Sequence, residues 1–244
     1  MAGPLPLFVH MPRTGGTSLT TRLRRSFPNV LRLSERAEFN VFLAMTAAER
    51  ASFDLIAGHM PFGADAFIPR PCRYIVWLRD PVDRFVSSYF HARSHRDDGL
   101  HGFAREHGLR EFAENAPTFM RDNGQTRRLA AWDWSEVIAD GPFWWQRVPI
   151  GQVTRGMLDQ AKANLDRAFV GLFERFAESA RACMLLLGIE GETPPVMNAA
   201  ARGGVVDDAT RDVICERNAL DFELYKYALK QSGGTLLSGT GLNY

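Results

Sequence analysis

A nine-residue run near the start of the chain, residues 10–18, has the composition of an anion-binding loop. Gly15 and Gly16 allow backbone N–H groups to turn toward a ligand, and the helix expected after them adds the positive end of its dipole. The side-chain donors in the run are three hydroxyls and one guanidinium, those of Thr14, Thr17, Ser18 and Arg13. The run predicts a phosphate or sulfate site. Taken alone, it also fits a two-glycine turn with a purely structural role.

The spacing of this loop argues against a nucleotide kinase or GTPase. A loop of that class reads G-x-x-x-x-G-K-[ST], with the lysine on the phosphates and the hydroxyl on Mg²⁺. Here no lysine follows Gly15 and Gly16. A sulfuryl group carries less charge than a γ-phosphoryl group, so amides, hydroxyls and one arginine can hold it without a metal. We therefore interpret the loop as a phosphosulfate site.

A second candidate anion site follows the clearest strand, predicted over residues 73–78. Asp80 and Pro81 supply an N-cap and a first helical residue, which predicts a helix from there to about residue 94. Arg79 leaves the end of the strand, and Ser87 lies roughly 9 Å along the helix axis from Pro81. A guanidinium and a hydroxyl so placed can bind one phosphate. The alternative is an arginine paired with a nearby aspartate and a serine packed on the sheet.

Transfer of a group to a hydroxyl requires a base, and two histidines are candidates. An imidazole suits this role because its unperturbed pKa of about 6.5 lies near the working pH. His59 follows Gly58 at the end of a predicted strand, between the two anion sites in the chain. His10 precedes the loop, and we expect it to order the loop by hydrogen bonding. We therefore predict that His59 is the general base.

The apolar pattern predicts strands that alternate with helices. The expected strands are residues 5–9, 53–58, 73–78 and 169–172, and the expected helices are residues 18–26, a short one from Thr46, 81–94, 117–132, 157–168, 176–187 and 208–231. Such alternation indicates an α/β fold with a mostly parallel sheet covered on both faces, whose ligands bind at the carboxyl ends of the strands. We expect one domain over residues 1–231 and a flexible tail over 232–244.

Both anion sites resemble elements of one enzyme family. Residues 8–19 resemble the 5′-phosphosulfate loop of the membrane-type carbohydrate sulfotransferases, notably the heparan sulfate 2-O- and 6-O-sulfotransferases and their bacterial relatives. Residues 74–89 are similar to the 3′-phosphate element of that family, in the same order. The family has lysine where this chain has Arg13, and arginine keeps the charge but cannot release a proton. The resemblance implies a P-loop-like, three-layer fold.

The resemblance also implies a donor and site residues. The donor is 3′-phosphoadenosine-5′-phosphosulfate (PAPS), released as 3′,5′-ADP, with no metal required. Its binding residues are Arg13, Thr14, Gly15, Gly16, Thr17, Ser18, Arg79, Ser87 and Arg202, the last in a loop that resembles the one closing over adenosine. His59 and Arg13 take the catalytic roles, and His91, one turn after Ser87, contacts the acceptor. The implied acceptor is an oligo- or polysaccharide or a glycolipid.

Bulk composition excludes several other classes. The chain has 244 residues, 45% of them hydrophobic, and a net charge of +1, which makes no case for a nucleic-acid partner. Three widely spaced cysteines indicate neither a zinc site nor a disulfide framework and fit a reducing compartment. No apolar run approaches the roughly 20 residues needed to cross a bilayer, so we expect a soluble, cytoplasmic protein.

Two alternative functions stay open at the level of sequence. One is a P-loop nucleotide kinase or NTPase, and the other is a non-catalytic protein of the same fold that binds a nucleotide or polyanion. The histidine- and arginine-rich residues 91–110 fit an acceptor surface or a solvated helix face equally well. Four tryptophans, at 132, 134, 144 and 145, could stack on sugar rings, although we expect most of them in the core.

Overall fold

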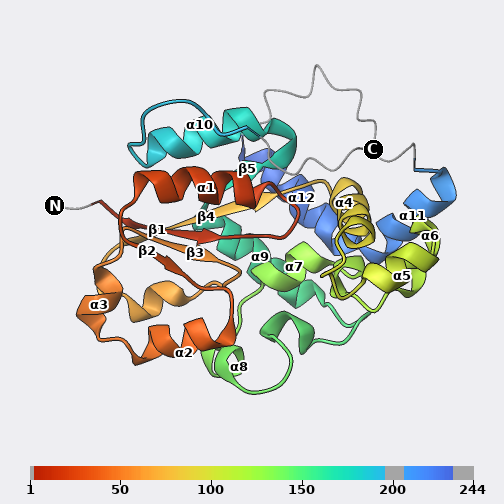
Figure 1. Ribbon diagram of the computed structural model, residues 1–244, viewed down its shortest axis with the longest axis horizontal. Coiled ribbons are helices and arrows are strands. Elements are labelled where there is room, and N and C mark those ends of the chain that lie inside the picture. Colours follow the sequence, from red (N-terminus) through yellow and green to blue (C-terminus); the bar gives the residue numbers. More distant parts are fainter. Residues whose placement is uncertain (1–2, 196–205, 233–244) are drawn as a thin grey trace.

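The computed structural model describes residues 3–195 and 206–232. Its centre is a five-stranded sheet with the order β2-β3-β1-β4-β5, in which every neighbouring pair is parallel. The strands are β1 (Leu5–Val9), β2 (Val30–Arg32), β3 (Leu55–Gly58), β4 (Cys72–Leu78) and β5 (Ala168–Leu172). Helices cover both faces of the sheet (Figure 1), which confirms the predicted three-layer α/β fold.

The helices of the described residues are short to medium in length. They are α1 (Gly16–Ser26), α2 (Arg36–Ala44), α3 (Ala47–Ala51), α4 (Pro81–Ser94), α5 (His101–Glu106), α6 (Leu109–Asn115), α7 (Gly124–Leu129), α8 (Trp134–Ile138), α9 (Arg155–Asp166), α10 (Phe176–Leu186), α11 (Asp208–Arg217) and α12 (Ala219–Gln231). Single 3₁₀ turns lie at Ala64–Phe67, Phe119–Arg121, Trp144–Gln146 and Phe173–Arg175. Within the described ranges, no helix is both long and apolar enough to cross a membrane.

The strands carry apolar side chains on both sides, as a parallel sheet between two helical layers requires. On one face Phe8 and Trp77 pack against side chains of α1 and α10. On the other face Leu7 and Val76 pack against α2, α8, α9 and α12. Figure 1 shows α1 and α10 on one side of the sheet and α2 and α8 on the other. Because β1 is buried along its whole length, the loop that follows it starts from a rigid strand.

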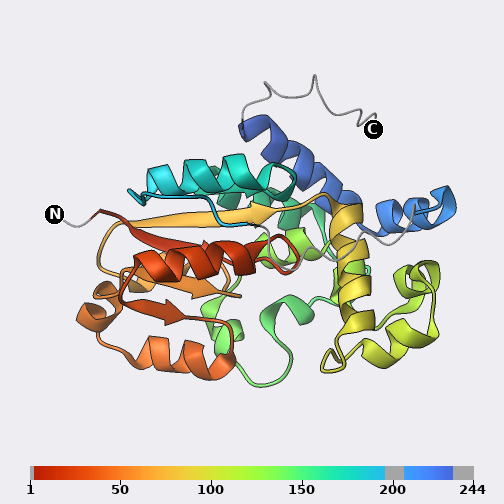
Figure 2. The same cartoon turned by 45° about the horizontal axis from the view of Figure 1, so that its top comes forward.

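A third apolar cluster lies outside the sheet layers and is built by α4, α5, α6 and α11 around Phe85, Phe112 and Ile214. Figure 2 shows α4 leaving the end of β4 and standing beside the sheet. The loops after β1, β3 and β4 leave the same edge of the sheet, because parallel strands end together. The fold therefore places both predicted anion elements and the predicted base at one edge.

Two of the predicted helices are wrong in extent. The helix expected over 117–132 is a 3₁₀ turn followed by α7, with Asn123 in the left-handed region at φ 48°. The helix expected over 208–231 is divided at Asn218 into α11 and α12. The other predicted helices and all four predicted strands are present within two or three residues of the expected bounds. Five further elements were not predicted from the sequence, namely β2, α2, α5, α6 and α8.

The two breaks have one physical cause, which is mutual capping of α7 and α12. The side-chain oxygen of Asn123 accepts hydrogen bonds from the backbone N–H groups of Leu220 and Asp221, at the start of α12. The carboxylate of Asp221 in turn accepts from the N–H groups of Gln125 and Thr126, at the start of α7. Each helix start thereby satisfies donors that a helix leaves unpaired, which a reading of one segment at a time cannot detect.

Candidate active site

The loop between β1 and α1 has a backbone that favours glycine. Gly15 has φ +80° and is the N-cap of α1, and Arg13 also lies in the left-handed region at φ 67°. A Cβ on Gly16 would lie 2.0 Å from Cδ2 of His10, far inside contact distance. The loop therefore needs glycine for conformation at one position and for space at the next, and it leaves the first N–H groups of α1 near a cavity.

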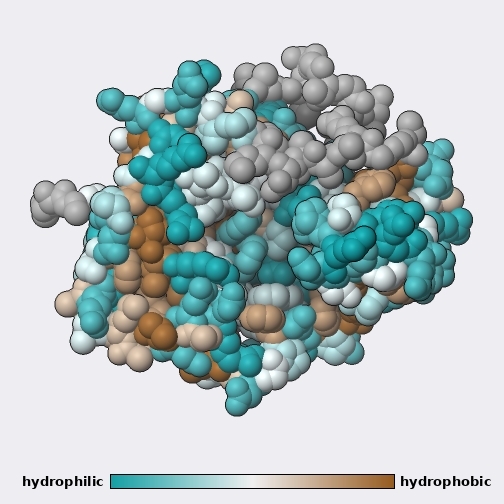
Figure 3. Space-filling view, viewed as in Figure 1, coloured by the Kyte–Doolittle hydropathy of each residue, from teal (hydrophilic) through white to brown (hydrophobic). Residues whose placement is uncertain are grey.

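The structure brings the two predicted anion elements into direct contact. The Nε and Nη2 groups of Arg13 donate to Oγ of Ser87 at 3.2 and 3.1 Å, across 74 residues of sequence. Nη1 of Arg79 donates to the backbone oxygen of Arg13 at 3.2 Å, and its guanidinium lies 4.2 Å from the ring centre of Phe173. These groups line a cavity of about 40 Å³ together with His10, Gly15, Gly16 and Thr17. Figure 3 shows hydrophilic side chains in the hollow between the sheet and the helices around α4.

The three hydroxyls predicted as donors differ in where they point. Thr14 is fully buried, and its hydroxyl donates to the backbone oxygen of Met11 at 2.9 Å. Ser18 is also buried. Thr17 is exposed and lines the cavity. Thr17 is therefore the hydroxyl of the loop best placed for a ligand, whereas Thr14 fixes the loop and contributes through its backbone.

A buried network that sequence reasoning missed supports the loop from behind. Arg84, fully buried on α4, donates from Nε to the backbone oxygen of Pro12 at 3.3 Å. Its Nη1 lies 3.7 Å from the carboxylate of Asp221. Burial lowers the pKa of Arg84 to about 10, and the charge of Asp221 opposes this shift. The amide of Gln125 exchanges two hydrogen bonds with the backbone of Arg79, at 3.1 and 2.9 Å. The network thus positions both anion elements.

His59 lies where the sequence predicts it, directly after β3, and its ring is oriented by the anion loop. Nδ1 of His59 lies 2.7 Å from the backbone oxygen of His10, and the two imidazole rings stack with centroids 4.6 Å apart. A carbonyl only accepts, so Nδ1 carries the proton and Nε2 keeps its lone pair. Burial, followed by the charge of Arg128, lowers the pKa of His59 to about 4. Burial lowers the pKa of His10 to about 3. Both rings are therefore neutral near pH 7.

The remaining predicted site residues are His91 and Arg202. His91 lies on α4 one turn after Ser87, with Nε2 3.9 Å from the carboxylate of Asp98 and its ring 3.9 Å from that of His95. Its pKa is lowered by burial and then by the charge of Arg13, which places it electrostatically near the site. Arg202 lies outside the described residues. No group of three or more His, Cys, Asp or Glu in 3–195 and 206–232 is arranged to hold a metal ion.

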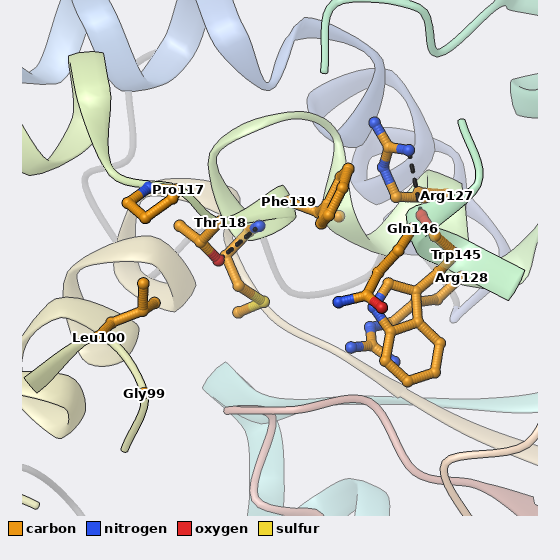
Figure 4. Close-up of a pocket in the computed structure, with 11 residues that line it drawn as sticks. Gly99, Leu100, Pro117, Thr118, Phe119, Arg127, Arg128, Trp145 and Gln146 are labelled. Carbon is orange, nitrogen blue, oxygen red and sulfur yellow. Dashed lines mark hydrogen bonds between the residues drawn. The ribbon is translucent and has the colours of Figure 1, made fainter. Parts of the chain in front are cut away.

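A larger cavity of about 430 Å³ opens beside α7 (Figure 4). Arg128 and Trp145 lie on its wall, with the guanidinium 3.8 Å from the centre of the indole ring. Burial and the charges of neighbouring arginines lower the pKa of Arg128 to about 9. Trp134 and Trp144 are buried in the main core, so the expectation of a core role is confirmed for these two. The sequence around Arg128 resembles a recurring segment of the family, but it assigned this arginine no role.

The chain is similar in sequence to known sulfotransferases. A profile described as the sulfotransferase family matches residues 70–228, which include Arg79 and Ser87. Heparan-sulfate 6-O-sulfotransferase 1 of Gallus gallus and that of Homo sapiens are each 32% identical to it over 183 residues, covering 66% of this chain and 43% of each relative. The chain therefore spans less than half the length of these curated relatives.

Two solved structures resemble the fold. A sulfotransferase from Alicyclobacillus acidocaldarius aligns over 95% of this chain and 96% of its own, with a TM-score of 0.48 and 17% identity. A mouse sulfotransferase solved in complex with PAP aligns over 94% and 86%, with a TM-score of 0.41 and 14% identity. Because the family profile matches well over half of this chain, the chain belongs to the sulfotransferase family.

Proposed function

We propose that the protein transfers a sulfuryl group from PAPS to a hydroxyl of a carbohydrate acceptor. The observation that carries this proposal is the contact between Arg13 and Ser87, which joins the two anion elements at 3.1 and 3.2 Å. PAPS carries a 5′-phosphosulfate and a 3′-phosphate, and it needs two anion sites close together. The named heparan-sulfate relatives support a saccharide acceptor.

The residues present fit such a donor. The φ of Gly15 and the absence of a Cβ on Gly16 leave room at the start of α1, where N–H groups and the helix dipole favour an anion. Arg13 and Thr17 add a charge and a hydroxyl for the phosphosulfate end. Arg79 and Ser87 line the same cavity, where they suit the 3′-phosphate. Arg202, in the loop predicted to cover adenosine, completes the proposed donor set.

When bound, PAPS supplies the sulfuryl group: the sulfur–oxygen bond to the 5′-phosphate breaks, its electron pair stays on that phosphate, and a new bond forms to the acceptor oxygen. Arg13 and the N–H groups at the start of α1 stabilise the charge that develops on the bridging oxygen. Their alignment before the reaction is maintained by Arg84, which holds Pro12, and by Arg79, which holds the backbone of Arg13. This arrangement calls for no metal ion in the step.

His59 takes the proton of the acceptor hydroxyl at Nε2. Its Nδ1–H is held by the backbone oxygen of His10, so the tautomer suits a base. A pKa of about 4 makes it a weak base in the free protein. A bound polyanion raises the pKa of a nearby imidazole, because negative charge favours the imidazolium form. Binding of the donor thereby shifts the pKa of His59 toward the working pH. His91 is proposed to contact the acceptor.

Binding measurements test the donor assignment without turnover. We expect 3′,5′-ADP (PAP) to bind more tightly than 5′-AMP, because only the former reaches Ser87 and Arg79. Replacing Ser87 by alanine removes one hydroxyl and should weaken PAP binding about three- to tenfold. Ser88→Ala is the matched control, since Ser88 follows it on α4 and does not line the cavity. Tight binding of ATP-Mg²⁺ with no response to PAP would reject the donor in favour of a nucleotide kinase.

Transfer of radiolabelled sulfate from PAPS to saccharides tests the reaction itself. We expect His59→Ala to lose at least about 100-fold in kcat, the usual contribution of a general base, while PAP affinity is kept. His107→Ala is the control, because His107 lies at the end of α5 and lines none of the cavities around the site. PAP binding with no transfer to any saccharide would identify a non-catalytic nucleotide-binding protein. Full transfer by His59→Ala would assign the base elsewhere.

A further inference from the structure

A cavity of about 320 Å³ lies between α1 and the ends of β2 and β3. Its wall includes four residues of α1, namely Thr17, Thr20, Thr21 and Arg24, and we call it the threonine pocket. These positions follow the i, i+3, i+4, i+7 spacing of one helix face. The volume lies within the range of small-molecule sites. Of the residues that line this pocket, Thr17 alone also belongs to the proposed donor set.

The threonine pocket reaches the proposed base. His59 lines it, whereas His59 lines neither the small anion cavity nor the cavity beside α7. The threonine pocket and the anion cavity share His10 and Thr17 as a common wall. A hydroxyl that meets both the base and a sulfuryl group held at the anion loop therefore has to lie against this shared wall.

The lining of the pocket suits a polyhydroxylated ligand. Oγ1 of Thr20 is buried and has no hydrogen-bond partner within the described residues. A buried hydroxyl left unpaired costs free energy, so a ligand hydroxyl at this point gains from completing the bond. Thr21 and Ser34 add two more hydroxyls to the lining, and Ser34 also accepts the backbone N–H of His59 at 3.2 Å. Among the described residues, the aromatic rings that line the pocket are the two imidazoles.

Two arginines mark the mouth of the pocket, and they differ in their pairing. Arg32 forms ion pairs with Glu35 and Glu38, at 2.8 and 3.4 Å. Arg24 is exposed, and no ion pair or hydrogen bond of its side chain is present in the described ranges. Arg24 is therefore the charge at the mouth that is available to an acidic substituent on a neighbouring sugar unit.

We propose that the sugar unit that receives the sulfuryl group occupies the threonine pocket. Thr20 and Thr21 bind its ring hydroxyls, and Arg24 attracts an acidic group on the adjoining unit. This assignment rests on the proposed function, since it takes His59 as the base. The competing location is the cavity beside α7, where Arg128 and Trp145 offer a charge and a stacking surface (Figure 4).

Variants in the two cavities distinguish these locations. Thr20→Val keeps the shape of the side chain and removes the hydroxyl, and we expect it to raise the acceptor KM about three- to tenfold. Thr21→Trp should fill the pocket and abolish transfer while PAP affinity is kept, which also shows that the variant folds. Arg24→Gln should raise the KM of an acidic oligosaccharide more than that of a neutral one. Arg25→Gln is the matched control, because Arg25 is the next exposed arginine of α1 and lies outside the pocket lining.

The assay uses labelled PAPS with neutral and acidic oligosaccharides, heparan sulfate among them, and calorimetry with PAP. Unchanged KM in the Thr20 and Arg24 variants, together with a raised KM in Arg128→Gln and Trp145→Leu, would move the acceptor to the cavity beside α7. Full transfer by Thr21→Trp would also overturn the assignment. Wild-type protein that binds PAP and transfers to no saccharide would instead reject the proposed function, and the pocket assignment with it.

Discussion

Gly16 tests whether the anion loop and the histidine pair form one packed unit. A Cβ at this position would lie 2.0, 2.2 and 2.9 Å from Cδ2, Nε2 and Cγ of the His10 ring. Comfortable contact between carbon atoms begins at about 3.5 Å, so Gly16→Ala forces the ring or the loop to move by roughly 1.5 Å. Overpacking of this kind costs about 1–3 kcal/mol. If the loop moves, that cost appears as about five- to 150-fold weaker PAP binding.

A double-mutant cycle isolates the cause of that loss. Removing the ring in His10→Ala makes room for the new methyl group, so we expect the double variant to bind PAP as His10→Ala does. Gly102→Ala is the control, because that glycine lies in α5 with nothing within 4 Å of an added Cβ, and there alanine should be neutral or slightly stabilising. Calorimetry with PAP gives each affinity. Wild-type affinity in Gly16→Ala, or an equal loss in the presence and absence of the His10 ring, would refute the packing argument.

Three further predictions concern charge and packing. Burial, followed by the charge of Arg128, lowers the pKa of His59 from 6.5 to about 4, so Arg128→Gln should raise that pKa by removing the second cause. The proposed base His59 acts only when neutral, so the acid limb of kcat/KM should move to higher pH. At pH values well below the pKa, activity should fall about tenfold for each unit by which the pKa rises. Asp221→Ala leaves the buried Arg84 unpaired and should lower the free energy of unfolding by about 3–5 kcal/mol in denaturant titrations. Gly171→Ala would place a Cβ 2.5 Å from the Trp77 ring and should lower the melting temperature, with a cost of about 1–3 kcal/mol.

Sequence patterns predicted the strands and helix starts that depend on residues close together in the chain. Short apolar runs predicted β1, β3, β4 and β5. Asp80 followed by Pro81 predicted the start of α4, where the Asp80 carboxylate accepts a hydrogen bond from the N–H of Asp83. The two anion elements were predicted because each is a strand end joined to a helix start. Their joint position at one edge follows from parallel strand order, which alternation of strands and helices already indicated.

What the sequence could not predict depends on contacts between distant segments. The reciprocal capping between Asn123 and Asp221 joins residues 98 apart, and it broke two helices that periodicity alone had extended. The hydroxyl of Thr14 was predicted to face the ligand, yet it donates to Met11 inside the loop. Both errors concern the direction of a polar side chain, which spacing along the chain does not determine.

The buried network also explains how arginine in place of the usual lysine can be held in the anion loop. A flexible lysine places one point charge, whereas the fork of Arg13 has to be oriented in a plane to reach Ser87. That orientation is constrained from both sides: Arg84 holds the backbone of Pro12, and Arg79 holds the backbone oxygen of Arg13. Arg84 in turn depends on Asp221 of α12. Helix α12, more than 130 residues from Ser87, is therefore part of the physical basis of the proposed donor site, because it fixes the backbone from which the arginine reaches.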